Sequence, residues 1–449
     1  MTKNTKHIFI ETERSFQDSF QKEPTFIIRS PGRVNLLGEH TDYNGLPVLP
    51  MAIDRCIVIA GRTRDDQTMH VISSHHQNES ITFDLCPSIP KHPQGHWANY
   101  VKAGVQGIIS NICSDDQIKD LSGCDIFLSG DIPLASGLSS SSALVVASAL
   151  ALLDANQISI DPRVLAEWMA EAEWFVGTRG GGMDQAACLL GRSDHLLKID
   201  FFPLKVTPVP WHPDYTVVIC DSGVQAKKTE GALQAYNLRS AECQLAKQLI
   251  NNHLKQAGQN ITINRLGDLL HPSHSYTYDD LNELIQHALQ DSYSLEEIIS
   301  ILSNEKAVLD ILNDCSIPTD ANQEFHCGKR YRHIVTDGWR VEQSQTYLSN
   351  QDMHSFAECM RLGHQSARDD FEISCPQLDQ LVELALQNGA IGARLTGAGF
   401  GGSTVNIVHN KKIDSFISKM QSTYYLDQPV TNQESILITK PSNCAKRVK

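Results

Sequence analysis

The hydrophobic pattern changes its period on either side of one polar stretch, residues 130–143. Residues 125–128 are typical of a half-buried strand, whereas the apolar run over 144–151 predicts a helix that is packed on most sides. The stretch between them reads Gly-Asp-Ile-Pro-Leu-Ala-Ser-Gly-Leu-Ser-Ser-Ser-Ser-Ala. We therefore predict a strand, a loop and a helix in succession here, and the rest of the chain is interpreted around this turn.

The serines of this stretch stand where the helix is predicted to begin. Gly137 allows the backbone to turn, and the unpaired N–H groups and dipole of a helix start attract anions. The hydroxyls of Ser139, Ser140, Ser141 and Ser142 are able to cap the helix, bind phosphate oxygens or reach a metal. An ordinary serine N-cap explains one of the four and leaves three without a role. We therefore favour a phosphate site.

Hydrophobic periodicity predicts a mixed set of further elements. Strands are expected at 26–29, 57–60, 215–221 and 404–408, and helices at 97–112, 165–176, 229–253, 281–289, 295–312 and 376–388, with further helices between 331 and 362. Residue 26 is expected to open the first ordered stretch. The length predicts two to three domains, and we place one boundary near residue 207, giving halves 1–207 and 208–449 with a helical insertion at 254–330.

Composition and charge exclude several classes of function. A formal net charge of −14 argues against non-specific nucleic-acid binding, which needs a basic surface. We find neither a signal peptide nor an apolar run long enough for a membrane span, so a cytoplasmic protein is expected. The 12 cysteines occur singly, without metal-ligand spacing, and are expected to be reduced core residues.

Residues 30–45 concentrate short polar groups between apolar runs. Arg33, Glu39, His40 and Asp42 offer a guanidinium, two carboxylates and an imidazole. Carboxylates accept hydrogen bonds from sugar hydroxyls, so the segment suits a site for a polyhydroxylated molecule. The alternative is a simple turn at 42–45 and a surface ion pair between Arg33 and Glu39, which explains two residues more easily than all four.

Two glycine-rich segments add to the candidate site. Residues 177–182 end in three glycines just before Asp184, which either points at a ligand or simply caps a helix. Residues 394–403 contain Gly-x-Gly-x-x-Gly, but a strand is predicted next, so a loop bordering a phosphate site is favoured over a dinucleotide site. Trp97 and Tyr100 are able to stack on a purine, although helical spacing alone favours the core.

Three of these segments together resemble the motifs of the GHMP small-molecule kinases. Residues 32–44 are similar to the galactokinase signature, 133–141 to the serine loop and 394–402 to the third glycine-rich motif, and the resemblance continues through 183–185 and 368–376. It implies an α+β fold of two lobes with the active site between them. It also implies transfer of phosphate from ATP to the anomeric hydroxyl of a galactose-type sugar, with Mg²⁺ and no covalent intermediate.

The resemblance implies a role for each matching residue. Asp184 matches the proposed catalytic base and Arg33 the cation beside it. Arg33, Glu39, His40, Asp42, Gly181, Asp184 and Tyr236 match sugar contacts; Gly137, Leu138, Ser139, Ser140, Ser141 and Ser142 match the phosphate loop; Trp97 and Tyr100 match the adenine side; Ser141 and Glu173 match the metal ligands.

Two departures leave the substrate open between galactose and N-acetylgalactosamine. The glycine segment at 177–182 and the fourth serine, Ser142, look more like the N-acetylgalactosamine kinase branch, whereas Tyr236 matches galactokinases. We place galactose first. A sugar sensor without useful turnover is a further alternative, but such sensors tend to lose serine-loop residues that are present here. The expected partners are a sugar and ATP, with no nucleic acid and no membrane, and a monomer is expected.

Overall fold

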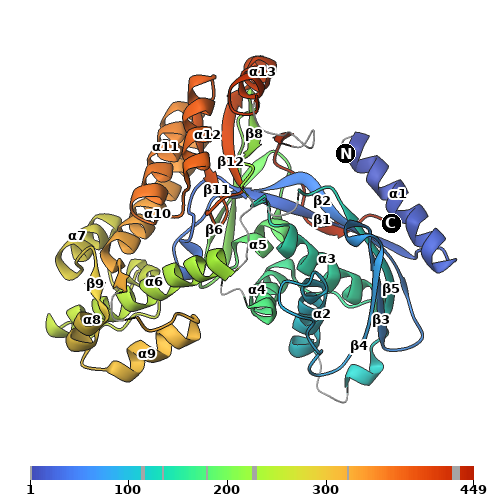
Figure 1. Ribbon diagram of the computed structural model, residues 1–449, viewed down its shortest axis with the longest axis horizontal. Coiled ribbons are helices and arrows are strands. Elements are labelled where there is room, and N and C mark those ends of the chain that lie inside the picture. Colours follow the sequence, from blue (N-terminus) through green and yellow to red (C-terminus); the bar gives the residue numbers. More distant parts are fainter. Residues whose placement is uncertain are drawn as a thin grey trace.

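A six-stranded sheet and a four-stranded sheet organise the computed structural model, which describes residues 3–112, 117–133, 136–177, 180–224, 230–320, 323–426 and 435–449 (Figure 1). The larger sheet has the order β14-β1-β2-β5-β3-β4 and is antiparallel except between β3 and β5. Its strands are β1 (Phe26–Asn35), β2 (Pro50–Thr63), β3 (Thr68–Ser73), β4 (Glu79–Asp84), β5 (Cys124–Gly130) and β14 (Lys446–Arg447).

Helices cover both faces of the larger sheet. Helix α1 (Lys3–Phe20) lies on the outer face, where Phe16 packs against Val58 and Phe127 (Figure 1). On the inner face lie α2 (Ala98–Ile112), α3 (Ser140–Ala155), α4 (Pro162–Ala172) and α5 (Met183–Leu190). Helix α3 is buried along most of its length, as its apolar run predicts. We call this sheet with α1–α5 the first lobe.

The second lobe is built on the smaller sheet, whose order is β11-β12-β8-β13. Its strands are β8 (Tyr215–Asp221), β11 (Gly392–Thr396), β12 (Ser403–His409) and β13 (Ile436–Thr439). Its helices are α6 (Glu230–Gln256), α7 (Tyr278–Ala288), α8 (Leu295–Leu302), α9 (Glu305–Asp314), α10 (Cys327–Ser349), α11 (Met353–Asp369), α12 (Pro376–Gln387) and α13 (Ile413–Thr423).

Short elements complete the architecture. A hairpin of β6 (His195–Asp200) and β7 (Lys205–Pro210) connects the lobes, and β9 (Tyr293–Ser294) pairs with β10 (Glu324–Phe325). The 3-10 helices are η1 (Asp42–Asn44), η2 (Ser74–His76), η3 (Gln117–Asp120), η4 (Glu173–Val176), η5 (Leu266–Leu270) and η6 (Asn410–Lys412).

The structure confirms the predicted α+β class and most elements, with two corrections. The first ordered element is α1, not the strand at residue 26. The helix expected over 295–312 is two helices, because Ser303 has a left-handed backbone and Asn304 caps α9. The helices expected between 331 and 362 are α10 and α11, and Asp352 caps the second by accepting from the Ser355 N–H.

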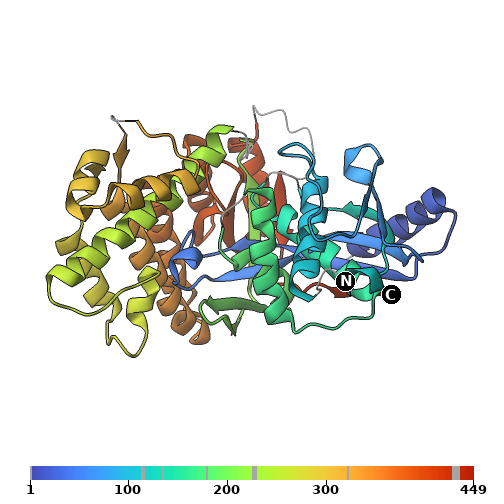
Figure 2. The same cartoon turned by 90° about the horizontal axis from the view of Figure 1, so that it is seen from below.

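The chain crosses between the lobes more than once. The predicted boundary near residue 207 falls inside β7 and stays a prediction, but β14 returns from the chain end to pair with β1. The loop after β1 reaches across to α10, as the blue segment beside that helix shows in Figures 1 and 2. Leu46 of this loop joins the core of the second lobe.

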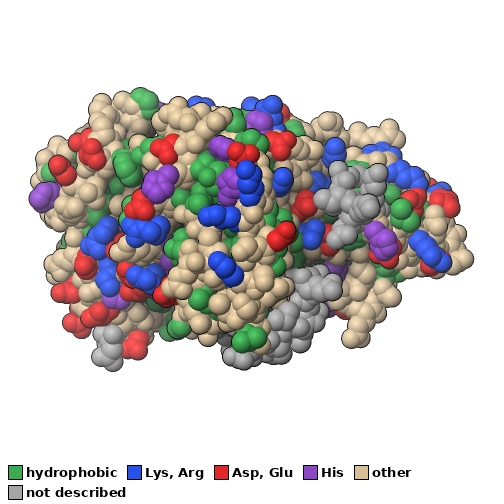
Figure 3. Space-filling model, turned by 90° about the horizontal axis from the view of Figure 1, so that it is seen from above, with side chains coloured by type: hydrophobic (Ala, Val, Ile, Leu, Met, Phe, Trp, Pro, Cys, Tyr) green, Lys and Arg blue, Asp and Glu red, His purple; other side chains and the backbone are tan. Residues whose placement is uncertain are grey.

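Two further observations concern the surface charges and the lengths of the helices. On the face seen in Figure 3, basic and acidic side chains are interspersed. None of the helices in the described ranges is long and apolar enough to cross a membrane.

Candidate active site

A cavity of about 390 Å³ lies between the lobes and brings the three predicted motifs together. Its walls come from β1 and the loop that follows, the loop before α3, the start of α5, α6 and the loop between β11 and β12. Predicted site residues that line it are Arg33, Glu39, His40, Asp42, Trp97, Tyr100, Gly137, Leu138, Ser139, Ser140, Ser141, Glu173, Gly181, Asp184 and Tyr236. Ser142 is buried beneath them in α3 and does not line the cavity.

Arg33 and Asp184 form a two-point ion pair in this cavity. The Nε and Nη2 atoms of Arg33 lie 2.6 and 3.0 Å from the two carboxylate oxygens of Asp184. The remaining Nη1 donates to the carbonyl of Gly137 at 2.6 Å. Burial lowers the pKa of the guanidinium, but the carboxylates of Asp184 and Glu39 outweigh it and raise that pKa above its usual value. Arg33 therefore stays charged and fixes the direction of Asp184.

The serine loop contacts both Asp184 and the third motif. Ser139 has a left-handed backbone (φ 59°), and its hydroxyl donates to Asp184 Oδ2. Gly137 also has a positive φ, and a Cβ on Gly397 would lie only 2.9 Å from the Gly137 carbonyl oxygen. The serine loop and the glycine-rich loop after β11 are therefore in backbone contact across the lobes. This close approach requires glycine at position 397. Residues 134 and 135 of the predicted loop lie outside the described residues.

Glu39 lines the cavity and is almost completely buried. Its Oε1 accepts from the Gly397 N–H at 3.0 Å. Burial raises the pKa of Glu39 to about 7, although Arg394 and Arg33 act in the opposite direction. Glu39 is thus a buried hydrogen-bonding carboxyl group rather than one half of the surface ion pair considered above.

His40 is held in a strained conformation among aromatic rings. It has φ 63°, its Nδ1 lies 2.9 Å from the Tyr43 hydroxyl, and its Nε2 lies 3.2 Å from the Ala398 carbonyl. Its ring centroid is 5.1 Å from Tyr236 and 4.8 Å from Phe371. Burial lowers the pKa of His40 to about 3, so the imidazole is neutral at physiological pH. The carbonyl is only an acceptor, so the proton is assigned to Nε2.

Of the glycines at 180–182, Gly181 lies against Asp42, whereas Gly182 has more space around it. A Cβ on Gly181 would lie 2.1 Å from Asp42 Oδ2, so no larger residue fits there without a shift. The Met183 N–H donates to the same oxygen at 3.4 Å. Burial raises the pKa of Asp42 to about 6, and the charge of Asp184 adds to this effect. Thr178 and Arg179 of the predicted segment lie outside the described residues.

The predicted adenine residues belong both to the cavity and to the core. Trp97 is 7% exposed, its indole N–H donates to Glu79 at 2.7 Å, and its ring stacks on His76 with centroids 5.3 Å apart. Tyr100 lines the cavity as well. The two interpretations offered for this pair, core packing and a ligand surface, are therefore compatible.

Ser141 and Glu173 fit a magnesium ion through their donor chemistry. One hydroxyl and one carboxylate line the same cavity, from α3 and η4. Among the described residues there is no group of three or more His, Cys, Asp or Glu side chains able to hold a metal. Mg²⁺ usually takes only one or two carboxylates and completes its shell with phosphates and water, so this sparse set suits it.

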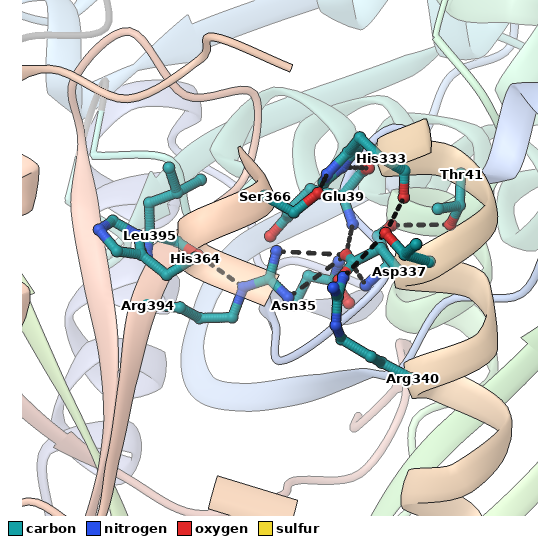
Figure 4. A network of polar contacts seen from close by, with 12 residues as sticks. Asn35, Glu39, Thr41, His333, Asp337, Arg340, His364, Ser366, Arg394 and Leu395 are labelled. Atoms are coloured by element: carbon teal, nitrogen blue, oxygen red, sulfur yellow. Dashed lines mark hydrogen bonds and ion pairs between the residues drawn. The ribbon is translucent and has the colours of Figure 1, made fainter. Parts of the chain in front are cut away.

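Sequence reasoning missed the residues that support the loop after β1. Asp337 and His333 of α10 face this loop, and Arg394 of β11, which the third predicted motif already includes, binds Asp337 (Figure 4). All three side chains are fully buried. The available signal was a histidine and an aspartate four residues apart, hence on one helix face, within a segment that also supplies buried Ile334 and Val341.

Comparisons with known proteins give a consistent result. Residues 14–63 match the family model described as the galactokinase galactose-binding signature, 99–192 the GHMP kinases N terminal domain and 344–426 the GHMP kinases C terminal domain. The chain is 32% identical to a galactokinase of Dictyostelium discoideum, over 94% of this chain and 89% of that one. It is 35% identical to a galactokinase of Chloroflexus aggregans, over 91% and 90% of the two chains.

Solved structures agree with these relatives. A Lactococcus lactis galactokinase complexed with galactose superimposes with a TM-score of 0.74 at 25% identity, covering 98% of this chain and 99% of that one. A D-glycero-D-manno-heptose 1-phosphate kinase from Bacteriodes thetaiotaomicron superimposes with a TM-score of 0.55 at 12% identity, covering 94% and 98%, and shares the fold alone. The predicted two-lobed GHMP kinase fold is confirmed.

The raised pKa of Glu39 predicts a pH-dependent effect on stability. Since the folded-state pKa lies above the unfolded value, burial of the ionised group costs free energy that is fully felt above about pH 7 and absent below about pH 4.5. Glu39→Gln retains an acceptor for Gly397 and removes this cost. The melting temperature of Glu39→Gln minus that of the original protein should therefore be larger at pH 8.5 than at pH 5, by about 3 °C or more. Calorimetry at both pH values checks this, and a pH-independent difference would contradict it.

Proposed function

This chain belongs to the galactokinase family, and from that premise we propose that it is an enzyme that transfers the γ-phosphoryl group of ATP to the C1 hydroxyl of galactose. The observation that carries the proposal is the position of the Arg33–Asp184 pair. Asp184 accepts from Ser139 of the serine loop, and the next residue towards the N-terminus, Met183, donates to Asp42. These contacts link the pair to the serine loop and to Asp42, which supports a position between the proposed phosphate and sugar sites.

The proposed reaction is a direct in-line displacement. The C1 oxygen attacks the γ-phosphorus, the bond from that phosphorus to the β–γ bridging oxygen breaks, and ADP leaves with the electron pair. Asp184 orients the C1 hydroxyl and takes its proton, which gives galactose 1-phosphate. Because the transition state of phosphoryl transfer is loose, positioning and charge neutralisation matter more than a strong base. Arg33 supplies a fixed positive charge and holds Asp184 in place.

ATP is proposed to occupy the end of the cavity formed by the serine loop. The first-turn N–H groups and hydroxyls of α3, at Ser140 and Ser141, suit phosphate oxygens, with Gly137, Leu138 and Ser139 leading into them. Ser142 is proposed to support this loop from beneath. Trp97 and Tyr100 are assigned to the adenine. Ser141 and Glu173 would hold Mg²⁺, which when bound neutralises charge on the phosphates.

Galactose is proposed to occupy the opposite end. Glu39, His40 and Asp42 offer hydrogen-bonding groups that are buried and fixed by their own contacts. Buried polar groups of this kind discriminate against ligands that lack the matching hydroxyl. Gly181 lets the backbone approach Asp42, and Tyr236 covers His40.

The cellular location, the division of the chain into two halves and the oligomeric state are also part of this proposal. All 11 cysteines in the described ranges are free thiols, which supports the proposed cytoplasmic location, a reducing compartment. The division near residue 207 and a monomeric state are kept as proposals.

The function is tested by measuring ADP release with Mg·ATP and a panel of acceptors. Galactose, N-acetylgalactosamine, glucose, arabinose and mevalonate are supplied separately, and omission of Mg²⁺ is the control for metal dependence. We expect selective turnover with galactose. Selectivity for N-acetylgalactosamine would show that the glycine segment before Asp184 determines the substrate, and binding of galactose and ATP without turnover would identify a sensor.

Replacing the proposed base provides the sharpest test of the mechanism. Asp184→Asn keeps the size of the side chain but removes the proton acceptor, so kcat should fall by at least about a hundredfold while the fold is retained. Asp200→Asn, at a half-exposed carboxylate that pairs with Lys198, is the matched control and should keep its activity. Near-normal turnover of Asp184→Asn, with a melting temperature like that of the control, would remove Asp184 from this role.

Tyr236 is predicted to act on the sugar rather than on the nucleotide. Tyr236→Phe removes only the hydroxyl and keeps the ring beside His40, so KM for galactose should rise about fivefold and KM for ATP should remain within about twofold. Steady-state kinetics with each substrate varied in turn measures both. Equal changes in the two constants would refute this placement.

A further inference from the structure

We infer that Asp337 and His333 are positioning residues that set the affinity for the sugar through Glu39. We call these two side chains the α10 clamp. The inference deepens the proposed function and rests on it, because it assumes that Glu39 contacts the sugar. Neither side chain lines the cavity, so both act from behind the loop after β1 (Figure 4).

Asp337 binds two backbone N–H groups of the loop after β1. Its Oδ2 accepts from the backbone N–H groups of Gly38 at 2.9 Å and Glu39 at 3.2 Å. Gly38 has φ 88°, and a Cβ there would lie 2.7 Å from the Pro47 carbonyl oxygen, so the loop is folded tightly at this point. A buried N–H group without an acceptor costs free energy, so this carboxylate stabilises one particular path of the backbone.

His333 holds the opposite side of the same residue. Its Nε2 lies 3.0 Å from the Glu39 carbonyl oxygen, and its Nδ1 lies 3.0 Å from the Ser366 hydroxyl. Burial lowers the pKa of His333 to about 4, so the ring is neutral and donates from Nε2 to the carbonyl. His333 and Asp337 are four residues apart and lie on one face of α10, so a single rigid helix fixes both ends of the Glu39 backbone.

The fixed backbone leaves the Glu39 side chain little freedom. Its Oε1 is bound by the Gly397 N–H at 3.0 Å, so main chain and carboxyl group are held from two different elements. His40 follows directly with its strained φ of 63°, a conformation that persists only where its surroundings enforce it. The clamp therefore determines where the Glu39 carboxyl group lies, whereas His40 has its own contacts with Tyr43 and Ala398.

Charge explains why an aspartate can occupy this buried position. Oδ2 of Asp337 lies 3.4 Å from both terminal nitrogens of Arg394, and Oδ1 lies 3.3 Å from Nη1 of Arg340. Burial opposes ionisation, but the charges of Arg394 and Arg340, together with the hydrogen bond from the Gly38 backbone, outweigh it and hold the pKa of Asp337 below its usual range. The carboxylate is therefore a permanent acceptor, whereas an amide would turn an N–H₂ group towards donors.

If Asp337 and His333 had a purely structural role, their loss would have different effects on stability and on KM than if they position Glu39. Loss of a buried ion pair lowers stability and affects every substrate alike. Loss of a residue that positions Glu39 changes KM for the sugar selectively, and it does so only while residue 39 has a carboxyl group. A double-mutant cycle separates the two, since it measures whether one residue acts through another.

The experiment compares Asp337→Asn in two backgrounds, the original protein and Glu39→Ala. In the original protein we expect KM for galactose to rise at least about tenfold and KM for ATP to change by less than about twofold. In the Glu39→Ala background the same substitution should change KM for galactose by less than about twofold. His333→Ala is taken through the same cycle with the same expectation, so a poorly folding Asp337→Asn does not end the test.

Asp125→Asn is the matched control, since Asp125 is a buried carboxylate paired with Arg64 in the first lobe, away from the cavity. It should lower the melting temperature without changing either KM. Equal effects of the clamp substitutions with and without Glu39 would overturn this inference alone. No turnover of galactose by the original protein, or an unchanged KM for galactose in Glu39→Ala, would overturn the proposed function or sugar role on which it depends.

Discussion

Buried backbone must find hydrogen-bond partners, and the loop between β1 and β2 is the place where this requirement joins the two lobes. The loop leaves the larger sheet and enters the second lobe, where Leu46 is part of the core. Its N–H groups are satisfied within the loop, as between Leu36 and Leu49, and by Asp337 from α10. Because most loops lie on the surface, a buried one needs dedicated partners. The cavity exists because these partners hold the loop between the lobes.

The same requirement explains why glycine and short polar residues concentrate here. At Gly181 and Gly397 a side chain would collide with a residue of a different motif, Asp42 or Gly137. Thr396 both donates to the Asn35 carbonyl and accepts from its N–H, each at 2.9 Å, so the end of β11 continues the bonding of β1 across the lobes. The motifs are therefore adapted to one another as much as to any ligand, and a change in one displaces its neighbours.

Sequence alone predicted those features that depend on local pattern. The turn into α3 and the grouping of polar residues at 30–45 were visible because period and composition change over a few residues. Helix α1 was missed because only part of one face, including Phe16, is apolar and buried. The α10 clamp was missed because Asp337 meets Gly38 from 299 residues away along the chain. Ser303 and Asn304 split a continuous apolar pattern through backbone geometry, which hydrophobicity does not report.

Electrostatics distinguishes the groups that line the cavity. The protein has a net charge of −14, so an anion needs a local positive field, and the first-turn N–H groups of α3 supply part of one, whereas the charge of Arg33 is paired with Asp184. Glu39 and Asp42 have pKa values raised by burial to about 7 and about 6, which limits their repulsion of Asp184. A neutral polyol suits these groups, since it donates hydrogen bonds without adding charge, whereas a phosphate would face carboxylates. Arg33 binds both Asp184 and the Gly137 carbonyl, and the charge of Glu39 also acts on it, so this one guanidinium links the three groups.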